Sequence, residues 1–140
     1  DLEKIGVRSK IVQWEWGTYL DKVSQGEHTM ALLGWTGDNG DPDNFLYVLL
    51  DKTAAERPAG NIAFYRSEEL HDVLVRARAS AVRDERDALY RQAQEIIFRD
   101  APWVPLVHAT QTAAFRHNVE GFKLHPTGNK WFRNVRINTP

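Results

Sequence analysis

The sequence predicts an α/β fold, because two short strand patterns flank a helix and two long amphipathic helices follow further along the chain. Residues 10–16 alternate apolar and polar side chains, and residues 29–35 form a continuous apolar run typical of a strand buried on both faces. A short helix over residues 18–25 separates them, with Gly26 as its stop signal. Strand, helix and strand at this spacing favour a parallel pair of strands joined by a right-handed crossover.

The middle of the chain predicts three further helices. One covers residues 42–50, with Asp41 as its N-cap. After a surface loop over residues 52–65, apolar side chains at helical spacing predict helices over residues 68–80 and 84–99. Beyond them we expect short strands over residues 103–108, 112–116, 121–125 and 131–137.

Composition is that of an ordinary globular domain, with 42% hydrophobic and 26% charged residues in a chain of 140. The 18 Lys and Arg residues are balanced by 19 Asp and Glu residues, so the chain lacks the excess positive charge of a protein that binds a phosphate backbone. We therefore expect no nucleic-acid partner. No apolar run approaches the roughly 20 residues of a membrane-spanning helix. The absence of cysteine excludes disulfides and thiolate chemistry.

The most unusual stretch of the sequence is 34–43, which follows the second strand pattern. This is the end of a strand at which open α/β sheets bind their ligands. Trp35 offers an aromatic surface, Thr36 a hydroxyl, and glycines such as Gly37 let a ligand approach the backbone. These residues are therefore candidate ligand contacts.

The acidic residues of this stretch differ in the local roles that the sequence assigns to them. Asp41 serves as a helix cap and Asp43 suits the positive end of the helix dipole, whereas Asp38 has no such role. Glycine spacing and nearby carboxylates disfavour a phosphate cradle, and the residues after Asp38 do not follow the pattern of an EF-hand calcium loop. Two interpretations stay open: Asp38 accepts a cationic amine, or the stretch is a structural turn.

Other chemistry finds little support in the sequence. Serines lie in no strand-to-helix elbow, and Asp38 with Asp41 is a conceivable hydrolytic pair whose separation the sequence does not define. We expect no catalytic residue, no cofactor and no metal site, since no histidine pair has metal-ligand spacing among His28, His71, His108, His117 and His125.

Several groups of residues together carry a family resemblance: Glu15-Trp16, Tyr19-Leu20, Val119-Glu120-Gly121-Phe122 and, most specifically, Gly34-Trp35-Thr36-Gly37-Asp38-Asn39-Gly40-Asp41-Pro42-Asp43-Asn44-Phe45. In these residues the chain resembles the bacterial peptide/nickel family of extracellular solute-binding proteins, which serve ABC importers. The resemblance implies the two-lobed type II periplasmic-binding-protein fold, of which this chain is a C-terminal part. Residues 1–109 would belong to ligand-binding lobe II, and residues 110–140 would return through the hinge to lobe I.

For function, the resemblance implies a non-enzymatic protein that binds dipeptides or short oligopeptides between its lobes and delivers them to a membrane permease. Asp38 matches the carboxylate that pairs with the α-amino group of the peptide, and Trp35 and Thr36 match residues that line the cleft, next to Gly37. The arginine that binds the peptide carboxylate would lie upstream. The alternatives are another solute (a nickel complex, a sugar or another small molecule) and a small hydrolase that uses Asp38 and Asp41.

The same resemblance implies a periplasmic or extracellular location, with a lipid anchor upstream of residue 1. Residues 1–6 are typical of the last turn of a helix with Gly6 at its left-handed C′ position, so we expect further chain before them. A sheet without its upstream strands has bare edges. We therefore expect this chain by itself to form a homodimer or a segment-swapped assembly.

Overall fold

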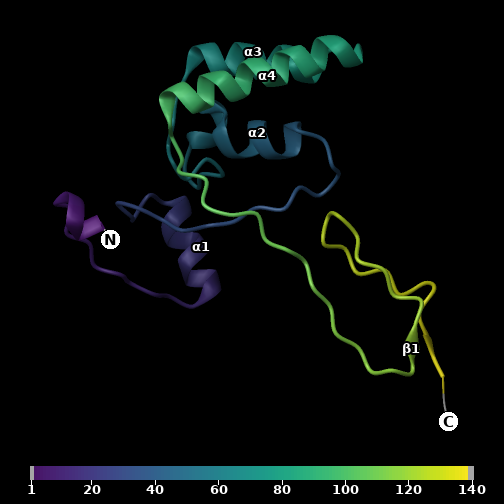
Figure 1. The fold of residues 1–140 in the computed structure, drawn as a ribbon. Helices are drawn as coiled ribbons and strands as arrows, with labels where there is room; N and C mark the ends of the chain where they lie inside the picture. The colour runs from purple at the N-terminus through teal and green to yellow at the C-terminus, as the bar shows by residue number, and fades with distance from the viewer. Residues whose placement is uncertain (1, 139–140) are drawn as a thin grey trace.

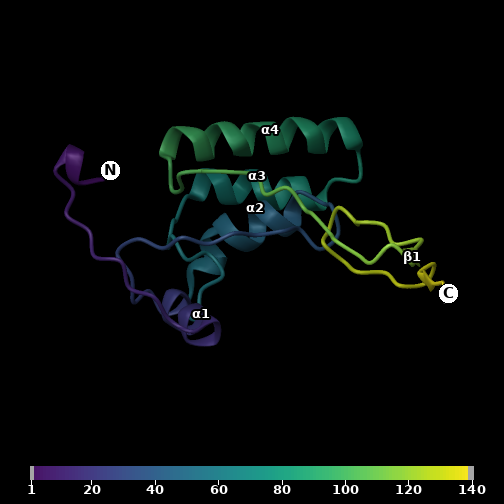
Figure 2. The ribbon, with the colours of Figure 1, turned by 60° about the horizontal axis from the view of Figure 1, so that its bottom comes forward.

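The computed structural model describes residues 2–138, in which most of the regular structure is helical. The helices are α1 (Trp16–Ser24), α2 (Asp43–Leu50), α3 (Glu68–Ala79) and α4 (Arg83–Asp100), with 3-10 turns at Leu2–Ile5 and Lys52–Ala55. In Figures 1 and 2, α2, α3 and α4 form one group, α1 lies beside the N-terminal segment, and the C-terminal residues leave on the other side. Among the described residues, no helix is both long and apolar enough to cross a membrane.

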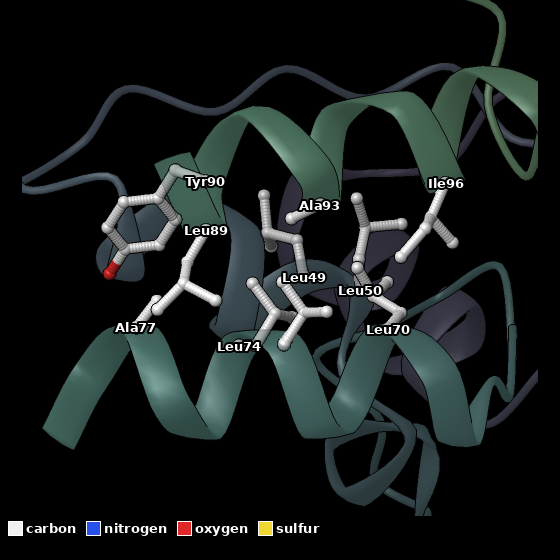
Figure 3. Close-up of a cluster of buried hydrophobic side chains, with 10 residues drawn as sticks. Leu49, Leu50, Leu70, Leu74, Ala77, Leu89, Tyr90, Ala93 and Ile96 are labelled. Atoms are coloured by element: carbon white, nitrogen blue, oxygen red, sulfur yellow. The ribbon is translucent and has the colours of Figure 1, made fainter. Parts of the chain in front are cut away.

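The core lies along the seam between α3 and α4, which α2 closes from one side (Figure 3). Helical spacing directs one apolar stripe of each helix into this seam. The fully buried Ala77 and Ala93 leave room for the two helices to approach closely. Each buried leucine contributes about 1.5–3 kcal/mol relative to an exposed one. The buried side chains are Leu49, Leu50, Leu70, Val73, Leu74, Ala77, Leu89, Tyr90, Ala93 and Ile96.

Local signals in the sequence set the helix ends, and the predicted helices are confirmed to within two residues. The hydroxyl of Ser67 accepts a hydrogen bond from the amide of Leu70 at the start of α3. Left-handed Ala101, with a φ of 47°, ends α4, and Gly26, with a φ of +76°, follows α1. Asp41 was expected as the N-cap of α2, but Pro42 occupies that position and Asp41 precedes it.

The predicted parallel strands over residues 10–16 and 29–35 are wrong for this structure, because neither segment joins a backbone ladder within residues 2–138. Trp16 instead begins α1, where the carboxylate of Glu15 accepts hydrogen bonds from two backbone amides. Apolar alternation shows which faces of a segment are suited to burial, but a strand also needs a neighbour that pairs with its backbone. No other described segment provides that neighbour.

The C-terminal residues form a hairpin with little regular structure: the strands expected over 103–108, 112–116 and 121–125 are absent from the described residues, and the one expected over 131–137 is reduced to its residues 136–137. The observed strands are β1 (Val119–Glu120) and β2 (Arg136–Ile137), which pair antiparallel with Val119 opposite Ile137. A Cβ on Gly121, where φ is +79°, would lie 2.0 Å from the carbonyl oxygen of Asn134. Only glycine therefore fits this close approach beside β1.

A buried carboxylate joins the end of α2 to α3. Asp51 is fully buried, and its Oδ1 accepts hydrogen bonds from the Thr53 amide (2.8 Å) and hydroxyl (2.6 Å). Its Oδ2 lies 2.8 Å from Nδ1 of His71 on α3. Burial by itself raises the pKa of Asp51, but the hydrogen bonds from Thr53 and His71 outweigh it and hold the pKa below its usual 3.8.

This lowered pKa predicts a loss of stability in acid. A carboxyl whose folded pKa is depressed stabilises the fold above its unfolded pKa, and that contribution disappears as the pH falls through the folded pKa. Asp51→Asn should therefore lower the free energy of unfolding by about 1–3 kcal/mol at pH 7, and its difference from wild type should shrink below pH 4. Urea unfolding between pH 7 and pH 3 measures both effects. Exposed Asp72 of α3 supplies the control variant Asp72→Asn, and equal pH dependence of Asp51→Asn and wild type would contradict the prediction.

Candidate functional site

The four predicted ligand residues lie on one exposed stretch between α1 and α2 (Figure 1). Trp35, Thr36 and Asp38 are exposed, with 43% of Trp35 accessible, and Gly37 is half-buried. The nearest atom to a Cβ placed on Gly37 would be Oδ1 of Asn44, at 3.7 Å. The aromatic ring, the hydroxyl and the carboxylate are therefore each accessible to solvent in this chain.

Asp41 binds an arginine of α4. Nη2 of Arg86 donates hydrogen bonds to both carboxylate oxygens of Asp41 at 2.9 Å, and the same nitrogen lies 3.2 Å from the hydroxyl of buried Tyr90. Oδ1 of Asp41 also accepts a hydrogen bond from the amide of Asp43 at 2.9 Å. The backbone bond from Asp43, followed by the guanidinium of Arg86, holds the pKa of Asp41 below its usual value.

A second arginine holds Asp43 at the start of α2. Nε of Arg78 on α3 lies 3.0 Å from Oδ1 of Asp43, and its guanidinium carbon lies 4.0 Å from the centre of the Tyr47 ring. A guanidinium stacked on an aromatic ring and paired with a carboxylate has restricted freedom. The loop and the N-terminus of α2 are therefore attached to both helices of the core seam.

Asp38 differs from both of these acids. Its backbone amide donates a 2.8 Å hydrogen bond to Oδ1 of Asn44, which fixes the main chain at this point. Within residues 2–138 its carboxylate forms no hydrogen bond or ion pair, and the side chain is exposed. Of the three acids between residues 38 and 43, Asp38 is the one whose charge remains available to a ligand.

A shallow hollow of about 220 Å³ lies between the end of the loop and the first turns of α4. Its lining residues include Gly40, Asp41, Arg86 and Tyr90 but not Asp38. Gly40 has a φ of +75°, which turns the chain between Asp38 and α2. No group of three or more His, Cys, Asp or Glu side chains in the described part of the chain could hold a metal ion.

Arg86 and Arg78 were not predicted from the sequence. Arg86 does leave a signal, since it lies on the same helical stripe as Tyr90, Ala93 and Ile97, which face the core. A cation within such a stripe requires a carboxylate partner from another element. The sequence does not show which carboxylate that is, because Asp41 is 45 residues away.

Comparison with known proteins shows to which family this sequence is related. Residues 1–57 match the family model described as bacterial extracellular solute-binding proteins, family 5 Middle. The chain is 39% identical to the dipeptide-binding protein of Escherichia coli over 98% of its own length, and 37% identical to heme-binding protein A of Haemophilus influenzae over the same share. The chain belongs to the family 5 extracellular solute-binding proteins of bacteria.

Structural similarity agrees with this assignment. The dipeptide-binding protein of Pseudoalteromonas, solved in complex with Met-Leu, superposes with a TM-score of 0.89 and 34% sequence identity over 98% of the chain. The chain covers 27% of that structure and about a quarter of the two curated relatives (25% of each). The type II periplasmic-binding-protein fold expected from the resemblance is confirmed, and this chain represents one segment of it. Members of the family are periplasmic or extracellular proteins that bind solutes.

Proposed function

We propose that this chain supplies one wall of a peptide-binding cleft in a two-lobed solute-binding protein, and that Asp38 binds the α-amino group of the peptide. The observation that carries the proposal is the division of labour among the loop acids: Arg86 neutralises Asp41, Arg78 neutralises Asp43, and Asp38 has no cationic partner among the described residues. The relatives named for dipeptides support a peptide as the ligand.

The proposed binding follows from the charges involved. An α-amino group has a pKa near 8 and is a cation at pH 7, so a cleft that removes it from water needs a fixed negative partner. Asp38 supplies that charge on a backbone that Asn44 holds in place. Trp35 gives the peptide an apolar wall, Thr36 a hydrogen-bonding hydroxyl, and Gly37 leaves room for its backbone. The opposite wall and the group that binds the peptide carboxylate belong to the remainder of the two-lobed protein.

The same proposal includes a role in transport. The protein would deliver its peptide to the transmembrane permease of an ABC importer from a periplasmic or extracellular position, held by a lipid anchor upstream of this chain. Residues 1–109 would stand in lobe II and residues 110–140 would return to lobe I. A cleft closed between lobes removes water from the ion pair at Asp38, which strengthens that interaction.

A second candidate function is the binding of another solute by the same loop, which the 37% identity to a heme-binding protein favours. A hydrolase that uses Asp38 and Asp41 has less support. The hydrogen bonds to Asp41 lower its pKa, and a general acid needs a carboxyl that stays protonated near neutral pH. Both alternatives are separated from peptide binding by the experiment below, because neither requires a free α-amino group on the ligand.

Replacing Asp38 with Asn in the complete two-lobed protein should weaken the binding of free dipeptides. The substitution keeps the size of the side chain but leaves a desolvated ammonium without its counter-charge, which costs about 2–5 kcal/mol. That corresponds to a loss of affinity of roughly 30-fold to several thousand-fold by isothermal titration calorimetry.

The matched control uses N-acetylated dipeptides, which lack the cation. They should bind wild type weakly and should hardly distinguish it from Asp38→Asn. If Asp38→Asn binds free dipeptides within about threefold of wild type, a difference below 1 kcal/mol, Asp38 is a turn residue and the proposed site is wrong. Wild type that binds a nickel complex, a sugar or heme but no peptide would favour the second candidate.

The chain of residues 1–140 by itself should bind dipeptides poorly. Asp38 is exposed on an open surface in this chain, and an ion pair in water is far weaker than one enclosed by two walls. Calorimetry with the same dipeptides on the chain and on the complete protein measures the difference. Tight binding to residues 1–140 would contradict the two-lobed cleft.

The chain by itself should also self-associate, as a homodimer or by exchange of segments. The segments expected as strands expose large apolar side chains, among them Ile11 (85% exposed) and Leu32 (77% exposed), and their backbones join no ladder within residues 2–138. Light scattering across a range of concentrations should show a mass above 16.1 kDa that falls on dilution. A clean monomer at high concentration would contradict this expectation.

A further inference from the structure

The ion pair between Arg86 and Asp41 connects the loop of residues 34–42, which carries the proposed ligand residues, to the helical core. Arg86 is on α4, whose apolar side chains pack against α3, and Asp41 lies 45 residues earlier in the loop. Both carboxylate oxygens of Asp41 lie 2.9 Å from Nη2 of Arg86, and the Arg86 side chain is 29% exposed. Arg86 thus attaches the loop to α4, in addition to the contact that Arg78 of α3 makes with Asp43.

Hydrogen bonds lead from this point toward Asp38. Asp41 accepts from the amide of Asp43, which begins α2, and Asn44 in the next position accepts from the amide of Asp38. The loop therefore closes into a ring in which the side chains of Asp41 and Asn44 hold the backbone at both of its ends. A shift of Asp41 away from α4 would move the helix start and, with it, the oxygen that orients Asp38.

We infer that Arg86 is a positioning residue for peptide recognition, acting on Asp38 through Asp41. The inference rests on the proposed function of Asp38 and adds a residue outside the loop to it. Arg86 does not contact the ligand in this arrangement, because it faces the hollow behind the loop, which Asp38 does not line. Its contribution is to order the loop before the peptide arrives, which lowers the entropy cost of binding.

The first experiment measures loop order in the complete two-lobed protein without any ligand. Amide hydrogen exchange, followed by NMR, should become severalfold faster at Asp38 and Asp43 in Arg86→Gln, while the amide of Leu74 in the core stays unchanged. Arg83→Gln is the matched control, since Arg83 lies on the same helix with a side chain 92% exposed. Unchanged exchange at Asp38 and Asp43 in Arg86→Gln would overturn the inference.

The second experiment measures dipeptide affinity in the complete two-lobed protein. Arg86→Gln should weaken binding of free dipeptides by roughly 3- to 30-fold, a range typical of coupled neighbours, and Arg83→Gln should leave it within twofold. Asp41→Asn should have a similar effect. The double variant should lose no more affinity for dipeptides than the single variant with the larger loss, because both changes break the same contact.

The outcomes separate this inference from the proposed function. Additive losses in the double variant would show that Arg86 does not act through Asp41 and would overturn the inference. If Asp38→Asn weakens binding but Arg86→Gln does not, the function stands and the positioning role of Arg86 is wrong. If wild type binds no peptide, the proposed function fails, while the exchange rates still decide whether Arg86 orders the loop.

Discussion

The apolar seam between α3 and α4 is the contact on which the candidate site depends, because the two arginines that hold residues 41 and 43 lie on these helices. Ala77 and Ala93 let the helices approach closely, and the leucines around them exclude water. Arg78 and Arg86 project from this pair toward the N-terminus of α2. The geometry of an exposed loop is therefore set by packing in a core to which the loop contributes no side chain.

Electrostatics distinguishes among three acids that lie within six residues of one another. Asp41 and Asp43 each meet a guanidinium, whereas the carboxylate of Asp38 meets no cation within the described residues. If all three acids were paired with cations, the loop would present no net charge to a ligand. If none were paired, the three carboxylates would repel one another. The two arginines leave a single negative charge at a defined place, which is what recognition of an amine requires.

Local sequence signals predicted the helices well, and non-local contacts explain the errors. The cap at Ser67 and the apolar stripes of α3 and α4 are formed by residues close together in the chain. These helices could therefore be predicted from the sequence of each segment alone. The segments over residues 10–16 and 29–35 carry strand-like patterns without strand pairing. A pattern of side chains describes the faces of one segment, while a ladder of hydrogen bonds requires a second one.

The candidate site divides in the same way. The sequence by itself determined the composition of the loop from Trp35 to Asp41, its position before a helix, and the absence of any local role for Asp38. Only the tertiary structure decided that Asp41 would be neutralised by Arg86, because the two residues are 45 positions apart and meet only after α4 has packed on α3. The physical reason is range: caps and turns are decided by neighbours in the chain, whereas the partner of a charge is decided by how the chain folds.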